Sequence, residues 1–291
     1  MQENIISTLR AGVQDGSIVP YIGPYALTGV VSKTDGAPIP ADSESLILAM
    51  NNGRPMAPKL MYEFPRAAMN LELKKGRSFV NRFLSQTYGA TEWTRAPLHD
   101  WIASIKPQYV VDINRDTQLL QSYSDTPHTL IQGCARIGGT EYRFRLFHYD
   151  GSKYSEVTQA QVDPKLPMLF KPMGTPLPDP SFIASDADYV DYITELMGGF
   201  AIPSFLKQYR KGIRYLLLGM RLTRDTERMV LSNIIYDASE PAGWVMIPEP
   251  TPKERRFCAN VGLEIIEADA AALYDDSLAM AVGEAARQVG C

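Results

Sequence analysis

The chain has 291 residues, a length that suits one large domain, and 45% of them are hydrophobic, enough for a sizeable core. Lys and Arg total 29 against 33 Asp and Glu, a formal net charge of -4, which gives no electrostatic reason to expect nucleic acid as a partner. No apolar run approaches the roughly 20 residues of a membrane span, and the N-terminus lacks the features of a secretory signal. Three widely spaced cysteines indicate neither a disulfide framework nor a metal site, so we expect a cytoplasmic protein.

Several common catalytic motifs do not occur in the sequence. The three histidines, His99, His128 and His148, are not paired at the HxxxH spacing of zinc proteases. The sequence contains no G-x-S-x-G nucleophile elbow and no G-x-x-x-x-G-K-[ST] phosphate loop. Side chains that act as general bases near neutral pH are therefore few.

The first third of the chain predicts one strand and a group of helices. Apolar residues at helical spacing predict a helix over residues 4–14, two or three helices over 58–88 and a short helix over 97–106. A short apolar run predicts a buried strand over 18–23, and a stretch rich in Gly, Pro and Ser predicts a loop over 24–45. The helices fall between the first and second predicted strands. We therefore expect a helical insertion at about 43–105, packed beside a nucleotide cleft.

The rest of the chain alternates strands with helices. The predicted strands cover residues 109–113, 128–133, 141–149, 168–170, 215–219, 244–247 and 263–266. The predicted helices cover residues 188–197, 203–210, 227–235, 252–261 and 270–288. Such alternation with short connections predicts an α/β fold with a doubly wound parallel sheet, formed by a single domain over residues 1–291.

Four segments resemble motifs of the sirtuin-like NAD-hydrolase family, in the family's order and over most of the chain. They are VPYIG at 19–23, DINRD at 112–116, LFKPMGT at 169–175 and LLGMRL at 217–222. The resemblance is to the short stand-alone bacterial branch, and it implies a Rossmann-like fold. NAD is the family's cofactor and a possible ligand here, but the altered motifs described below lead us to expect no bound cofactor. The resemblance also implies that Asn114 orients the water or the nicotinamide ribose, and that the cofactor contacts are Gly23, Asp116, Gly219 and Asp225.

The first motif departs from the family at the glycine-rich loop. The family sequence G-A-G-x-S lets the backbone approach a pyrophosphate and bind it with amides. Here Pro24 has no N–H, Tyr25 places a ring where the family has glycine, and Leu27 replaces a hydroxyl. Only Gly23 is retained, so we expect NAD to bind weakly or in an altered pose.

The third and fourth motifs have lost polar residues. The family's histidine, a general base, is replaced by Met173, which takes no proton. Loss of a general base costs about 10²- to 10⁴-fold in rate where it acts. His128 and His148 are not placed by any motif to substitute for it, and each is also explained as a structural histidine. The family's aspartate position holds Arg224, with Asp225 one residue later.

The second motif has two interpretations. Asn114 is the best remnant of a catalytic site in the resemblance. Alternatively, Asn114-Arg115-Asp116 caps the following helix, because Asn and Asp are favoured N-caps.

The sequence supports three hypotheses for function. The first is a catalytically inactive, sirtuin-like protein-binding accessory factor, and the resemblance suggests nitrogenase or an assembly factor as its partner. The second is an NAD hydrolase with a non-standard site around Asn114, Asp116 and Asp225. The third is a sensor that binds NAD or ADP-ribose without cleaving it. The eroded motifs favour the first.

Two segments are candidate interaction surfaces. The segment 50–61 carries methionines that suit adaptable contacts, with an ordinary loop as the alternative. Lys207, Arg210, Lys211 and Arg214 form a basic cluster that suits an acidic partner, with a solvated helix face as the alternative.

Overall fold

A nine-stranded sheet forms the centre of the computed structural model, which describes residues 5–280. In spatial order the strands are β11 (Leu263–Ile266), β10 (Gly243–Met246), β9 (Arg214–Leu218), β1 (Ile18–Ile22), β2 (Tyr109–Asp112), β6 (Met168–Lys171), β3 (His128–Gly133), β4 (Phe144–Tyr149) and β5 (Tyr154–Glu156). The pairs from β11 to β3 are parallel, and β4 and β5 are antiparallel at one edge. The predicted α/β fold with a doubly wound, Rossmann-like sheet is confirmed.

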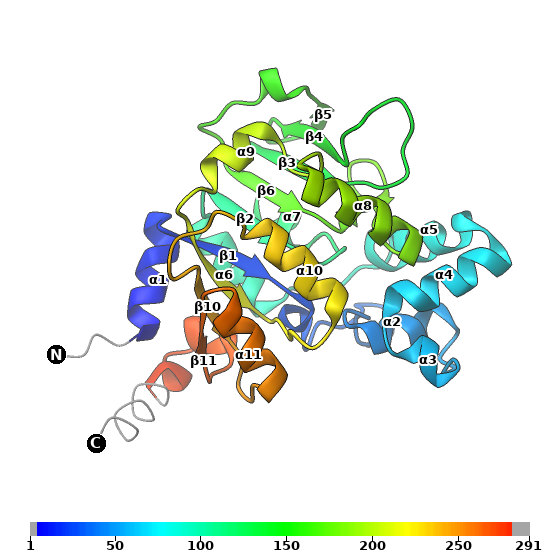
Figure 1. Cartoon of the computed structure of the whole chain (residues 1–291), viewed down its shortest axis with the longest axis horizontal. Helices are drawn as coiled ribbons and strands as arrows, with labels where there is room; N and C mark the ends of the chain where they lie inside the picture. Colours follow the sequence, from blue (N-terminus) through cyan, green and yellow to red (C-terminus); the bar gives the residue numbers. More distant parts are fainter. Residues whose placement is uncertain (1–4, 281–291) are drawn as a thin grey trace.

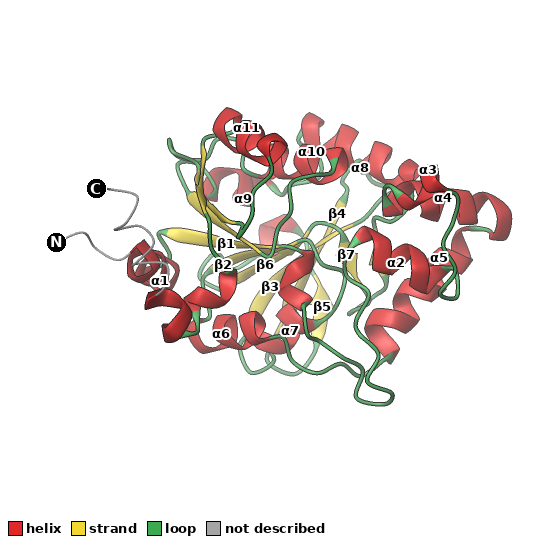
Figure 2. Ribbon diagram, turned by 90° about the horizontal axis from the view of Figure 1, so that it is seen from below, coloured by secondary structure: helices red, strands yellow, loops and turns green. Residues whose placement is uncertain are grey.

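Helices cover both faces of the sheet (Figure 2). One face carries α8 (Asp186–Gly198), α9 (Ser204–Tyr209), α10 (Asp225–Ile234) and α11 (Pro252–Asn260). The other carries α1 (Ile5–Asp15), α6 (Pro97–Ile105) and α7 (Gln118–Ser122). Every residue of β1, β2, β3 and β6 is buried, and β1 in particular is a continuous apolar run, as expected of a strand covered on both faces.

A third group of helices lies at one end of the sheet (Figure 1). It comprises α2 (Ser43–Met50), α3 (Pro58–Met61), α4 (Phe64–Lys75) and α5 (Arg77–Ser85), which share a core separate from the two sheet cores. Met50 is buried there, and Met56 and Met61 are partly buried against the same core, so Met50 is not at the surface and the other two are only partly exposed. Pro65 lies in the first turn of α4, where a missing N–H costs nothing.

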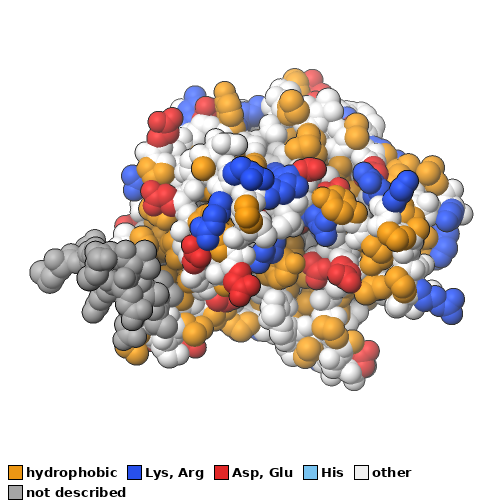
Figure 3. Space-filling view, turned by 60° about the horizontal axis from the view of Figure 1, so that its bottom comes forward, with side chains coloured by type: hydrophobic (Ala, Val, Ile, Leu, Met, Phe, Trp, Pro, Cys, Tyr) orange, Lys and Arg blue, Asp and Glu red, His pale blue; other side chains and the backbone are white. Residues whose placement is uncertain are grey.

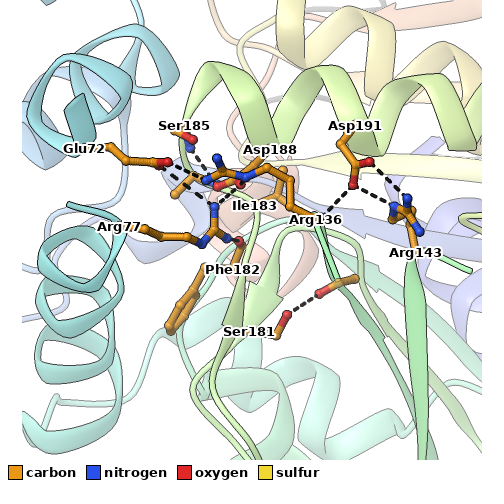
Figure 4. Close-up of polar contacts among 12 residues, drawn as sticks. Glu72, Arg77, Arg136, Arg143, Ser181, Phe182, Ile183, Ser185, Asp188 and Asp191 are labelled. Atoms are coloured by element: carbon orange, nitrogen blue, oxygen red, sulfur yellow. Dashed lines mark hydrogen bonds and ion pairs between the residues drawn. The ribbon is translucent and has the colours of Figure 1, made fainter. Parts of the chain in front are cut away.

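A buried aspartate joins this helical group to the sheet (Figure 4). Asp188 of α8 pairs with Arg77, at the start of α5, and with Arg136, in the loop after β3. Arg136 also pairs with Glu72 of α4 at 2.6 Å. The second oxygen of Asp188 accepts hydrogen bonds from the amides of Ala184 and Ser185. The start of α5, the loop after β3 and the start of α8 thus meet at one carboxylate.

The predicted closing helix over 270–288 is wrong in its first part. Ala270–Leu273 form a 3-10 turn, η4, and a helix begins only at residue 276. The Asp275 carboxylate accepts the Ser277 amide and so caps the start of that helix. Residues 281–288 lie outside the described part of the chain. Within residues 5–280, no helix is both long and apolar enough to cross a membrane.

Candidate functional site

The candidate site lies where the chain reverses its direction of travel across the sheet. From β1 the chain proceeds to β2 on one side, and later returns to β9 on the other side of β1. The carboxyl ends of these strands therefore bring Gly23, Asn114 and Gly219 to one edge. Open α/β sheets bind ligands at such a switch point.

The two glycine loops at this edge pack directly on each other. Gly23 N donates to Leu218 O at 2.8 Å, and Tyr25 N donates to Gly219 O at 2.9 Å. Gly219 has a φ of +64°, and a Cβ on it would lie 2.3 Å from Ala26 N. A Cβ on Gly23 would lie 2.7 Å from Gly219 O. Both glycines are required by this backbone contact, which occupies the space between the loops.

Backbone amides of the first loop are already paired. Pro24 has no N–H, Tyr25 N is used by Gly219, and Ala26 N donates to Gly23 O at 3.1 Å. These residues form the 3-10 turn η1 (Pro24–Leu27). A phosphate group would have to displace these bonds before it met a donor.

Asn114 is buried and fixes the loop after β1. Its Nδ2 donates to Gly23 O at 2.9 Å, and its own amide donates to Asp112 Oδ1 at 2.9 Å. Asp116 instead accepts the amide of Gln118 at 2.7 Å, at the start of α7. Asp116 thus satisfies the first amide of α7 from the residue before the N-cap, which is Thr117, whereas the Asn114 side chain links β2 to β1.

A small cavity of about 50 Å³ opens beside Asn114, between the sheet edge and the helical group. Met173, Phe64, Tyr189 and Glu227 are among the residues that line it. This volume suits one or two waters, whereas ligand pockets typically measure about 300–1,000 Å³. The cavity does not admit a nicotinamide ribose in this structure.

Glu227 is the acidic residue among those that line this cavity, and the sequence did not single it out. Burial raises the pKa of Glu227 to about 8; Arg224 opposes the rise, and Glu63 and Asp42 reinforce it. Glu63 is itself 7% exposed and accepts a 3.5 Å hydrogen bond from Thr226 Oγ1. A glutamate on the apolar side of the predicted helix 227–235, beside Val230, was the available sequence signal.

At pH values above 8, the variant Glu227→Gln is expected to have a higher melting temperature than the wild type. The pKa of about 8 exceeds the usual 4.5, so between these values the folded chain holds a proton that the unfolded chain releases. Stability therefore falls as pH rises from about 4.5 to 8, and Glu227→Gln should remove this dependence. Thermal unfolding from pH 5 to 9 measures it. Exposed Glu249→Gln is the control, and a wild-type slope in Glu227→Gln would refute the assignment.

Asp225 does not reach the cavity. Its side chain is 67% exposed and pairs with Arg228. Glu227, two residues later on the same helix, faces the cavity instead. The structure thus brings Gly23, Asn114 and Gly219 together, places Asp116 at the start of α7, and leaves Asp225 at the surface.

His128 and His148 lie at the opposite end of the sheet. His128 is the first residue of β3, and His148 of β4 is the strand partner of Thr129, the next residue of β3. The ring of His128 contacts Thr126 O and Tyr154 Oη, both at 2.8 Å, and burial lowers its pKa to about 4. Neither histidine lies near Met173, where the resemblance leads us to expect a general base.

A buried ion pair holds Asp112, the residue that accepts the Asn114 amide. Lys171 Nζ lies 2.7 Å from Asp112 Oδ2, and both side chains are fully buried. His99 Nε2 lies 3.8 Å from the same oxygen. Burial pushes the pKa of Asp112 upward, but Lys171 and His99 outweigh burial and hold it at about 2. The charged Asp112 in turn accepts the Asn114 amide.

A larger cavity of about 380 Å³ lies on the far side of the glycine contact. Its floor includes Met220 and Met246, and its walls include Tyr25 and Tyr274, which are 50% and 38% exposed. Arg221 also lines it, but its guanidinium already pairs with Glu254 at 3.1 Å. This cavity has the volume and the aromatic lining of a small-molecule site.

Metal and thiol chemistry have little support among the described residues. Within residues 5–280, no three His, Cys, Asp or Glu side chains are grouped as a metal ion requires. Cys134 and Cys258 are free and buried, and burial raises their pKa to about 12 and about 11. Cys291 lies outside the described residues.

Charged side chains of both signs are interspersed on the face drawn in Figure 3. A nucleic-acid backbone binds to a continuous basic surface, which is not what this side of the molecule presents. Comparison of the chain with protein-family models and with curated proteins gives no match.

Proposed function

We propose that this chain is a catalytically silent, sirtuin-like protein that works as a protein-binding accessory factor. The observation that carries the proposal is the contact between the loops after β1 and β9, where Gly23 and Gly219 pack backbone to backbone. A dinucleotide needs this space and these amides for its pyrophosphate.

Two features of the small cavity support the same proposal. Met173 is 3% exposed and stands where the resemblance expects a general base. The cavity beside it holds water-sized groups only. Asn114 has a structural task, the bond to Gly23 O, that explains its presence without catalysis.

Calorimetric titration with NAD and with ADP-ribose, followed by analysis for nicotinamide, tests the proposal. We expect no heat of binding and no nicotinamide, from the wild type and equally from Met173→His, because an added imidazole leaves the glycine loops closed. An active NAD hydrolase run alongside serves as the positive control. Nicotinamide release that Asn114→Ala abolishes would overturn the proposal in favour of an unorthodox hydrolase.

The resemblance suggests nitrogenase or one of its assembly factors as the partner. Co-purification of the tagged chain with nitrogenase components from a nitrogen-fixing host tests this part separately. Their absence from the purified complex would remove nitrogenase from the proposal and leave an accessory role with another protein.

The 380 Å³ cavity favours a second candidate function, a sensor that binds a nucleotide without cleaving it. Its walls include two tyrosine rings, which suit a planar base. Saturable binding of NAD or ADP-ribose without nicotinamide release, weakened by Tyr274→Ala, would select this function over the first.

A further inference from the structure

Helices α8 and α10 expose a stripe of large apolar side chains, here called the α8–α10 stripe. It consists of Val190 and Met197 on α8, which are 69% and 70% exposed, and of Met229 and Tyr236 on and just after α10, which are 46% and 65% exposed. The two helices pack side by side on the same face of the sheet (Figure 1). Val190 and Met197 are seven residues apart within α8, so this half of the stripe extends over two helical turns, and Tyr236 continues the other half past the end of α10.

The stripe ends in a groove between α8, α9 and α10. The groove has a volume of about 600 Å³, and Met197 and Tyr236 both line it. Lys207 of α9 and Lys211, just after α9, line its other side. The apolar stripe and the basic groove are therefore one continuous surface.

The two lysines are free to meet a partner. Within residues 5–280 neither Lys207 nor Lys211 takes part in an ion pair, and Asp237 is the acidic residue that lines the groove with them. Arg210, expected from the sequence to share their solvated face, is buried and donates to the carbonyls of Asn233 and Ile234. Arg210 thus completes the end of α10, and the two lysines give the groove a net positive charge.

We propose that the α8–α10 stripe and its groove dock an amphipathic helix of another protein, with its apolar side on the stripe and acidic residues against Lys207 and Lys211. An apolar row of two turns matches helix-in-groove recognition, and methionines adapt readily to such a ligand. The unpaired lysines set the sign of the partner's charge. The inference rests on the proposed accessory function and names the surface that performs it.

Two synthetic peptides of about 18 residues test the surface. Both carry the same leucine face, and one has glutamate and the other lysine on its polar face. In fluorescence anisotropy we expect the glutamate peptide to bind the full chain and the lysine peptide to bind at least about tenfold more weakly. We expect the affinity for the glutamate peptide to fall by about tenfold or more in Met197→Asp, and also in the double variant Lys207→Glu/Lys211→Glu.

The matched control is Leu73→Asp on α4, because Leu73 is 75% exposed and lies outside the stripe. It should leave binding unchanged. Equal binding of both peptides, binding of neither, or an equal loss in Leu73→Asp would overturn the assignment. A dimer in sedimentation that Met197→Asp dissociates would assign the stripe to a second copy of this chain instead.

Failure of the surface and failure of the accessory function give different results. NAD turnover with intact glutamate-peptide binding refutes the silent protein and keeps the surface. A co-purified partner that is retained by Met197→Asp keeps the accessory function and refutes the surface.

Discussion

Replacing Asp188 with alanine is expected to lower the free energy of unfolding by about 3 kcal/mol. Asp188 is fully buried, pairs with Arg77 and Arg136, and accepts two backbone amides (Figure 4). Removal leaves both guanidinium groups and both amides without this acceptor. The two arginine side chains are 31% and 32% exposed, so solvent compensates part of the loss, which places the value at the low end of the range for broken buried pairs.

Urea unfolding at pH 7 measures the effect, with Asp225→Ala as the matched control. Asp225 is 67% exposed, and its pair with Arg228 should contribute less than about 1 kcal/mol. A loss below about 1 kcal/mol in Asp188→Ala would show that the helical group is held to the sheet by its apolar contacts alone.

The sheet was predictable because its central strands are covered on both faces. Runs such as Tyr215 to Leu218 are apolar at every position, and such runs indicate buried parallel strands. The edge strand β5 (Tyr154–Glu156) was missed because it is three residues long and mostly exposed. The hairpin β7 (Gly174–Thr175) and β8 (Ser181–Phe182) was missed because two-residue strands have no period to detect.

The site was predictable only as far as the strand ends. Gly23, Asn114 and Gly219 meet because parallel strands end at one edge, which the order of motifs already implied. The choice between Asp225 and Glu227 depends on where α10 begins and how it is rotated, and a shift of one or two residues changes which acid faces inward. Arg77 and Asp188 are 111 residues apart in sequence, so local sequence patterns could not predict their pairing.

The sequence predicted one helical segment at about 43–105, but in the structure its helices belong to two different hydrophobic cores. Helices α2 to α5 share their own core, whereas α6 presents Leu98 and Ile102 to the core beneath the sheet. Amphipathic spacing identifies the buried side of a helix without identifying the surface that buries it. For the same reason the sequence suggested a surface position for Met50, which the helical core contains.

Replacing Lys171 with methionine is expected to lower the free energy of unfolding by about 3 to 5 kcal/mol at pH 7. Lys171 and Asp112 are both fully buried and lie 2.7 Å apart, so the substitution leaves a buried carboxylate without its cation. Asp112→Asn added to Lys171→Met removes the second charge and keeps an oxygen for the Asn114 amide, so the double variant should regain most of the loss. A urea-unfolding cycle of the single and double variants measures the coupling.

The pH dependence of Lys171→Met distinguishes a lost ion pair from poor packing. In the wild type the pKa of Asp112 is about 2, below its usual 3.8, so its contribution is present above pH 4 and lost as pH falls toward 2. Without Lys171 the burial of Asp112 is no longer outweighed and its pKa rises, so the sign reverses and the variant should lose stability as pH rises from 4 to 7. A deficit that stays constant over this range would assign the loss to packing. A deficit that grows with pH would establish that the charge of Lys171 holds Asp112 ionised and, through it, Asn114 in place at the edge of the sheet.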